Sequence, residues 1–320
     1  MTIDIKGVKF IKSIWVVYCL IEIFLIDINQ LNAQQILDST FAYKVENPVY
    51  PLNSGPIIHI DEYHNNDMSI NVRMFPLLKL LRHDGYRIQS YNDSFSTELL
   101  NEVEILVIIG ALHKSNINNW KLPTPSALTD SEMNVLLEWI DNGGSLLLVA
   151  DHMPFPGAIQ KFSSKLGVNW YNGFVIDSIN WGMTVFSRRD NTLLKHPIIE
   201  GKNKGEKVNW VATYYGSGFK IENDSIIGLL SFNNPNIVSY QTEQAWKIYP
   251  ETPIVSFKNL YQGAILKKGK GRVAFIGEAS LFSAQLVGEQ QNPVGLNFQN
   301  ENQNLQFVLN IFHWLSKEID

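Results

Sequence analysis

Short apolar runs alternate with segments of helical periodicity between residues 55 and 317. The runs at 104–110 and 145–150 are apolar without alternation, as expected of strands covered on both faces. The remaining runs are shorter but are bounded by Gly or by polar clusters. We therefore predict core strands at residues 56–60, 87–91, 104–110, 145–150 and 271–277.

Helical segments lie between these strands. The first is predicted to start near Phe75, because Pro76 suits the first turn of a helix and not its interior. A capping box, in which Thr129 and Glu132 satisfy the first free amides, opens a second helix that ends at Gly143. Further helices are predicted at residues 157–166 and 304–316.

This alternation predicts an α/β fold, a three-layer doubly wound arrangement around a mostly parallel sheet. We expect a single domain over residues 55–317, preceded by an extended lead-in at 34–54. Residues 168–266 are less regular and are expected to form an elaborated region on the same domain. This region is rich in Asn and contains four tryptophans, Trp170, Trp181, Trp210 and Trp246.

The first 33 residues have the layout of a secretory signal peptide. Three lysines within the first 12 residues precede a mostly apolar stretch at 14–26, and Ala33 places a small residue before Gln34. The apolar stretch is shorter than the roughly 20 residues of a membrane span. Glu22 and Asp27 interrupt the apolar pattern, which leaves an uncleaved anchor as the alternative. We expect an exported protein, periplasmic or secreted.

The amino-acid composition limits which partners the protein can bind and which catalytic groups it can use. The 320 residues are 45% hydrophobic and 18% charged, with a net charge of −5, which is typical of a globular protein. The one basic cluster, at 267–272, is better explained as a hairpin turn, so nucleic acid is excluded as a partner. The only cysteine, Cys19, lies in the signal segment. Cleavage would leave no thiolate nucleophile, disulfide or cysteine metal site.

Ionisable residues follow several of the predicted strands. Asp61 and His64 come after the first strand, Asp151 and His152 after the fourth, and Glu278 after the last. In open α/β sheets, ligands bind beyond the carboxyl ends of the strands. We therefore expect these five residues to line one concavity, with at least three side chains within about 8 Å of one another.

Two chemistries suit this set. Asp61, His64, Asp151 and His152 offer oxygen and imidazole ligands for Zn²⁺ or Mn²⁺, and the metal would lower the pKa of a bound water. Without a metal, two carboxylates, or a carboxylate with His152, would act as general acid and base.

Each of these motifs also has a structural interpretation. Residues 61–67 can form a turn in which Asp and Asn side chains bond the local backbone. Asp151 and His152 can be a buried pair that holds the following proline turn, and Glu278 can cap a helix. His59, inside the first strand, is expected to be a satisfied core or face histidine.

Four longer motifs carry a resemblance to a known family. They are Asp61-Glu62-Tyr63-His64-Asn65-Asn66, the segment 150–157 (ADHMPFPG), the segment 277–282 (GEASLF) and the closing His313-Trp314-Leu315-Ser316. With the order of elements, they resemble an uncharacterised bacterial family of exported class I glutamine-amidotransferase-like proteins, over most of residues 48–317. The resemblance implies a flavodoxin-like fold of three layers and supplies no activity.

The true amidotransferases of that superfamily carry a cysteine on a nucleophile elbow, backed by a histidine and a glutamate. This sequence has neither a Gly-x-Cys-x-Gly nor a Gly-x-Ser-x-Gly elbow, so glutamine hydrolysis by a thiolate is excluded. Two functions stay open. One is a hydrolase acting on a carbohydrate or peptide-like substrate; the other is a non-catalytic glycan- or peptide-binding, or scaffold, domain of the cell envelope. A membrane is a partner only if the signal stays uncleaved.

The signal interpretation yields the first testable prediction. The mature protein is expected to begin at Gln34, which N-terminal sequencing of the exported protein would check. Recovery of intact Met1 in a membrane fraction would contradict cleavage and support the anchor.

Overall fold

The computed structural model describes residues 35–67, 73–179, 182–298 and 303–320. The predicted signal segment at 1–33 and Trp181 lie outside the described residues. Within those residues, no helix is both long and apolar enough to cross a membrane.

A nine-stranded sheet forms the centre of the molecule, in the order β3-β2-β4-β5-β15-β14-β10-β6, with β11 also paired to β14. The first five strands of this order are parallel, and they are the five strands predicted from the apolar runs. Their bounds are β2 Ile57–Asp61, β3 Arg87–Tyr91, β4 Ile105–Ile109, β5 Ser145–Val149 and β15 Gly271–Ile276.

Antiparallel strands extend the sheet beyond β15. The hairpin between β14 and β15 pairs Lys268 with Gly271, so the basic cluster does form the hairpin turn that we predicted. The extension comes mostly from the irregular region at 168–266, which adds strands to the main sheet. Its strands are β6 Val168–Tyr171, β10 Gly218–Ile221, β11 Ile226–Phe232 and β14 Leu260–Lys268.

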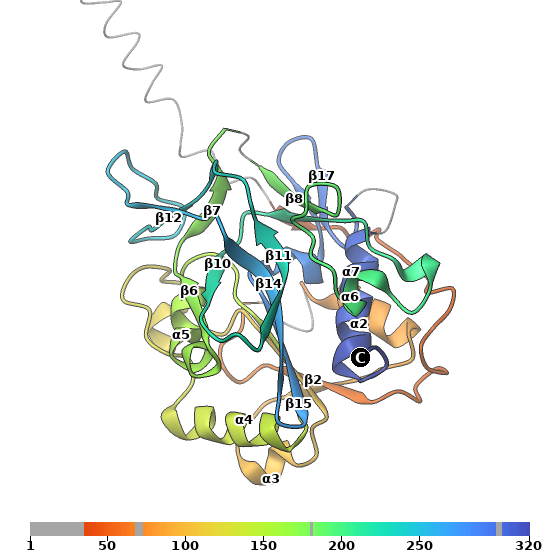
Figure 1. The fold of residues 1–320 in the computed structure, drawn as a ribbon. Helices are drawn as coiled ribbons and strands as arrows, with labels where there is room; N and C mark the ends of the chain where they lie inside the picture. Colours follow the sequence, from red (N-terminus) through yellow and green to blue (C-terminus); the bar gives the residue numbers. More distant parts are fainter. Residues whose placement is uncertain (1–34, 68–72, 180–181, 299–302) are drawn as a thin grey trace, which may run out of the picture.

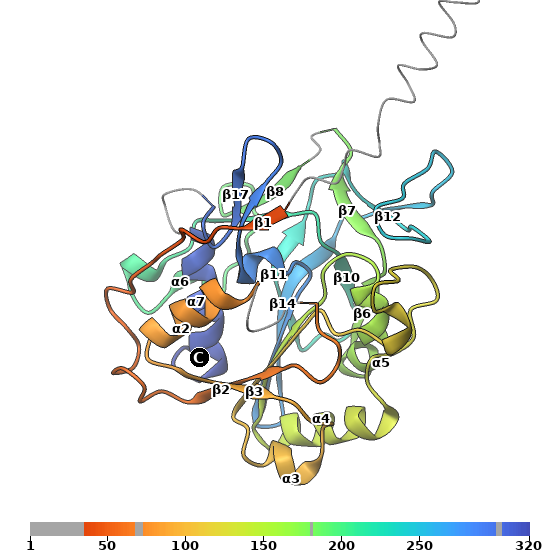
Figure 2. The ribbon, with the colours of Figure 1, turned by 180° about the vertical axis from the view of Figure 1, so that it is seen from behind.

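Helices cover both faces of the parallel strands, which confirms a three-layer α/β arrangement (Figures 1 and 2). One face packs against α2 Phe75–His83, α6 Pro197–Glu200 and α7 Gln303–Leu315. The other packs against α3 Thr97–Leu100, α4 Asp130–Asn142 and α5 Phe155–Leu166. Helix α5 begins two residues before the predicted start at 157, because Pro156 fits its first turn.

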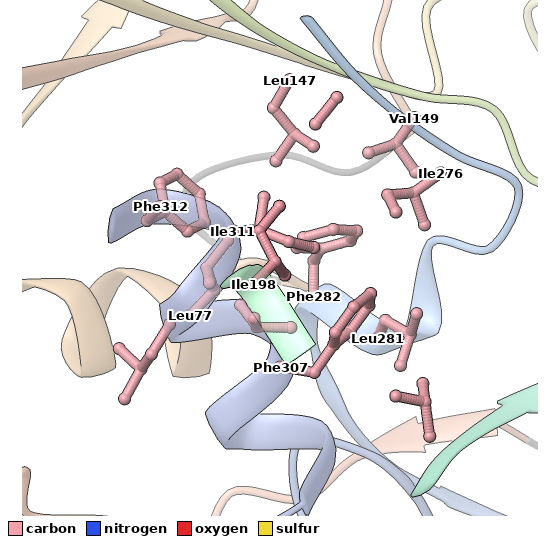
Figure 3. Close-up of a cluster of buried hydrophobic side chains, with 14 of the residues drawn as sticks. Leu77, Leu147, Val149, Ile198, Ile276, Leu281, Phe282, Phe307, Ile311 and Phe312 are labelled. Atoms are coloured by element: carbon pink, nitrogen blue, oxygen red, sulfur yellow. The ribbon is translucent and has the colours of Figure 1, made fainter. Parts of the chain in front are cut away.

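Side chains from six elements interdigitate between the sheet and α7 (Figure 3). Val149 on β5 and Ile276 on β15 project towards Phe282 and Phe307, and each of these four side chains is at most 1% exposed. Burial of such side chains contributes roughly 1.5–3 kcal/mol each, so this layer fixes β5 and β15 relative to each other.

A buried hydrogen bond joins the C-cap of α2 to α7. His313 Nε2 lies 2.7 Å from Asp84 Oδ2, and Asp84 Oδ1 accepts the Val49 backbone N–H at 2.8 Å. Asp84 therefore attaches the lead-in and the last helix to the same corner of the fold. His313 therefore has a structural role.

Three smaller sheets complete the fold. The lead-in contributes one strand, since Gln35 pairs with Val287. The order β1-β16-β17 comprises Gln35–Leu37, Ala284–Val287 and Asn292–Gly295. The order β13-β12-β7 comprises Ile254–Ser256, Ile237–Tyr240 and Phe174–Asp177, and the pair β8-β9 comprises Met183–Ser187 and Trp210–Tyr214.

Candidate functional site

Asp151 and Glu278 lie together at the carboxyl edge of the parallel strands. Val149 on β5 is directly opposite Ile276 on β15, and each carboxylate follows two residues later. Equal offsets from one parallel register bring the two residues to the same level on adjacent strands, about 4.8 Å apart in the sheet. This part of the predicted cluster is formed.

Glu278 is a buried carboxyl whose pKa is raised to about 8, first by burial and then by the charge of Asp151. Its Oε1 accepts the Ser280 N–H at 2.8 Å, and its Oε2 accepts the Leu281 N–H at 3.1 Å. These bonds cap a 3₁₀ turn, as the structural interpretation of Glu278 proposed. Both oxygens accept backbone N–H groups, and the residue is 1% exposed.

Asp151 is the accessible member of the pair. Its side chain is half-buried, and Oδ1 accepts the His152 N–H at 2.7 Å. Burial, with the charge of Asp67, raises the pKa of Asp151, although the neighbouring His152 and Arg73 oppose the shift. A carboxyl with a raised pKa stays protonated to a higher pH than an ordinary aspartate.

A tight loop covers Glu278. Tyr215 and Gly216 take φ values of 62° and 78°, and a Cβ at Gly216 would lie 2.3 Å from the Gly277 carbonyl oxygen. Only glycine fits that position. Ser217 Oγ then donates to the Ala150 carbonyl at 2.8 Å, which attaches the loop to the end of β5.

His152 points into an aromatic cluster. Its ring stacks on Phe174 at 4.4 Å and 14°, and Trp246 meets it edge-on at 4.5 Å. The Nδ1 atom lies 2.8 Å from the Met153 carbonyl oxygen, so it donates to that oxygen. The side chain is 7% exposed, and its geometry suits the positioning of Trp120 and Trp246 better than acid–base chemistry.

Asp61 and His64 belong to a different, buried network. His64 Nδ1 lies 3.0 Å from both Asp61 oxygens, and His64 Nε2 lies 3.0 Å from Glu132 Oε1. Burial alone would lower the pKa of His64, but its bonds to the two carboxylates outweigh burial and raise it. Asp61 is fully buried and His64 is 4% exposed, so the network stabilises the fold and does not face a ligand.

The strand registers explain this separation. Ile60 on β2 is opposite Val107, and Ile108 on β4 is opposite Leu148, so Asp61 lies level with Leu148. Asp151 is three residues further along and two strands away, which places the two backbones about 14 Å apart.

The metal-ligand set expected from Asp61, His64, Asp151 and His152 is therefore not brought together. Across the described residues, no group of three or more His, Cys, Asp or Glu side chains is arranged to hold a metal ion. This geometry contradicts the predicted Zn²⁺ or Mn²⁺ centre. Asp61 and His64 belong to the buried network that reaches Glu132 on α4, whereas Asp151 and His152 lie at the edge of the sheet.

A cavity of about 640 Å³ lies beside Asp151, within the range typical of ligand sites. Asp67, whose charge acts on Asp151, is on its wall, and so are Trp120 and Trp246, whose rings contact His152. The complete lining is Asn65, Asn66, Asp67, Leu112, Ile117, Asn118, Trp120, Gln244, Ala245 and Trp246.

Trp246 has an unusual backbone, with a φ of 64° that bulky side chains rarely adopt. The Ala245 N–H donates to the Trp120 carbonyl at 2.8 Å, which connects the two walls of the cavity. Strain of this kind persists where the surroundings fix it, often at functional sites.

The sequence places Trp246 in the irregular region, and neither Trp120 nor Gln244 was among the predicted site residues. Trp120 lies in an irregular stretch between β4 and α4 that carries no periodic signal. Its only sequence signal is a tryptophan in a loop that follows a core strand.

No protein-family model matches the sequence, and no curated protein matches it. Solved structures do resemble the fold. The mmIFT52 N-terminal domain superposes with a TM-score of 0.54 at 17% identity, covering 81% of this chain and 97% of that one. At this identity the likeness concerns the fold alone.

Two further structures are similar at lower scores. A ThuA-like protein from Bacteroides uniformis ATCC 8492 gives a TM-score of 0.45 at 13% identity, covering 86% of this chain and 94% of its own. A second ThuA-like protein, from Parabacteroides merdae ATCC 43184, gives a TM-score of 0.40 at 10% identity, covering 82% of this chain and 90% of its own.

The buried network around His64 predicts a pH dependence of stability. A raised pKa for His64 in the folded state stabilises the protein below the ordinary value of 6.5, and this contribution is lost as pH rises through the folded pKa. The difference in unfolding free energy between the wild type and His64→Gln, measured in urea, should therefore shrink as pH rises above 6.5. A difference that stays constant from pH 5 to 9 would contradict a charged His64.

Proposed function

We propose that this protein binds a neutral, polyhydroxylated ligand of the carbohydrate class in the cavity beside Asp151. The observation that carries the proposal is the lining: two half-buried tryptophan rings and several side-chain amides surround one cavity at the carboxyl edge of the sheet. Ligand sites of this fold class lie at that edge.

The chemistry of the lining supports a sugar over a charged ligand. Trp120 and Trp246 offer flat apolar surface, while Asn118 and Gln244 are exposed amides that can both donate and accept hydrogen bonds. The one carboxylate on the wall, Asp67, is paired with Arg73 at 2.8 Å, which reduces its net charge.

The two amide atoms of Asn66 are buried and lack a hydrogen-bond partner within the described residues. Buried polar atoms normally have partners, and those without them are costly. Asn66 is also a lining residue of the cavity, so its amide lies close to the proposed ligand.

We also infer that the fold belongs to the class I glutamine-amidotransferase-like group and that the protein acts after export. The order of the parallel strands and the motifs at 61–66, 150–157 and 277–282 support the first inference. The charged and apolar segments before Gln34 support the second. At the junction that follows β5, this chain carries Asp151 and no cysteine, so the proposal includes no amidotransferase activity.

Replacement of Trp246 by alanine is expected to weaken binding at least tenfold, because the ligand loses one aromatic face. A glycan array would identify the ligand, and isothermal titration calorimetry would measure Kd for the wild type and for Trp246→Ala. Trp120→Ala should behave in the same way.

The matched control is Trp210→Ala, at a half-buried tryptophan that packs on Phe298 away from the cavity. Its Kd should stay within twofold of the wild-type value. Equal losses for Trp210 and Trp246 would point to general destabilisation, and the absence of any glycan ligand would overturn the proposal.

A second candidate, hydrolysis of the bound ligand, is favoured by the raised pKa of Asp151, which interacts by charge with Asp67 on the cavity wall. In that function Asp151 would act as general acid or base, and Glu278 would be a positioning residue because it is buried and held by the backbone. Proton transfer of this kind contributes about 10²–10⁴ in rate.

Asp151→Asn is therefore expected to lower turnover of the array-identified glycan at least 100-fold, with Kd within threefold of wild type. Reducing-end release measured by chromatography would check this. Asp141→Asn, an exposed aspartate beside Lys268, serves as the control. Wild-type protein that binds the glycan and leaves it intact would rule out hydrolysis and keep the binding function.

A further inference from the structure

A second cavity, of about 240 Å³, lies at the other side of the parallel strands, against the edge strand β3. The four-residue helix α3 contributes Glu98 and Leu99 to its wall. We call this cavity the β3 groove. The lining residues that matter for its chemistry are His59, Gln89, Asp93, Glu98, Leu99 and Glu102.

The β3 groove is acidic. Asp93, Glu98 and Glu102 are exposed carboxylates on its wall, and the lining contains no lysine or arginine. Among the described residues, none of these three carboxylates forms an ion pair. These negative charges also affect a neighbouring tyrosine: burial and then the charge of Asp93 raise the pKa of Tyr91 to about 12.

His59 supplies an independent observation. Its side chain is 6% exposed and lines the groove, and its Nδ1 atom is buried without a hydrogen-bond partner in the described part of the chain. The expectation that His59 is a satisfied histidine is therefore wrong for this nitrogen. Burial lowers the pKa of His59, so its ring is neutral and one nitrogen carries a free lone pair.

We propose that the β3 groove binds an organic cation, an ammonium or guanidinium group, between the neutral His59 ring and the carboxylates of Glu98 and Glu102. The carboxylates balance the charge, and the imidazole nitrogen accepts one N–H. At about 240 Å³ the groove is smaller than a typical drug-sized site, which suits a single cationic group on a short chain.

The arrangement favours an organic cation over a metal ion. The described residues contain no group of three or more His, Cys, Asp or Glu side chains placed to ligate a metal. An N–H donor needs only one acceptor and opposite charge nearby, and the lining of the groove combines an imidazole with three carboxylates.

Calorimetric titration of the purified protein would test the proposal. The probes are agmatine, the capped tripeptide acetyl-Gly-Arg-Gly-amide and ZnCl₂. Agmatine or the tripeptide should bind, and Kd should rise at least fivefold in Glu98→Gln/Glu102→Gln. The control is Glu104→Gln, an exposed glutamate on the same segment that does not line the groove. Its Kd should stay within twofold.

The outcomes separate the sources of the cation. Tighter binding of agmatine would identify a free amine as the ligand, and tighter binding of the tripeptide would identify a basic side chain. Both glutamates are exposed, so the double variant should melt at the wild-type temperature. Zinc binding without amine binding, or equal losses in Glu104→Gln, would overturn the proposal.

Discussion

The candidate site depends on the parallel pairing of β5 with β15. These strands are separated in the chain by residues 150–270, yet their register sets Val149 opposite Ile276. Because Asp151 and Glu278 follow at equal offsets, the pairing brings two carboxyl groups together, and burial and the charge of Asp151 raise the pKa of Glu278. The packing of Phe282 and Phe307 beneath both strands supplies the apolar stabilisation that makes such a contact tolerable.

Four of the five parallel strands were predictable because each is a compact apolar run between turn signals, whereas β3 Arg87–Tyr91 alternates exposed residues with more buried ones. The sequence also predicted the helix of the capping box, since Thr129 and Glu132 bond reciprocally as the motif requires. It could not predict the level at which each strand ends relative to its neighbours. Asp61 and Asp151 both follow apolar runs, but β2 is placed so that Asp61 remains inside the sheet and faces Glu132 through His64.

The irregular region explains most of what sequence reasoning missed. It supplies Trp246 and Gln244 to the cavity and Gly216 to the cover over Glu278. The backbone conformations of Tyr215 and Trp246 have positive φ and no local sequence signal, because tertiary packing imposes them on residues that do not favour them. A propensity argument therefore works for the scaffold and fails for the loops that shape the site.

The buried glutamates Glu132 and Glu278 show how the surroundings of a carboxyl group set its pKa. Burial would raise the pKa of Glu132, but donors from Thr129 and His64 lower it, whereas burial and Asp151 raise that of Glu278 to about 8. A carboxyl whose pKa is lowered by folding contributes stability that is lost as pH falls. A carboxyl whose pKa is raised by folding contributes stability that is lost as pH rises through the pKa of the folded state. The raised pKa of His64, like that of Glu278, makes the folded state less stable as pH rises. Together with Glu132, whose contribution is lost as pH falls, these groups stabilise the fold most in a mildly acidic range. The contact between Asp151 and Glu278 therefore favours a pH at which Glu278 stays protonated, because two adjacent carboxylates would repel each other.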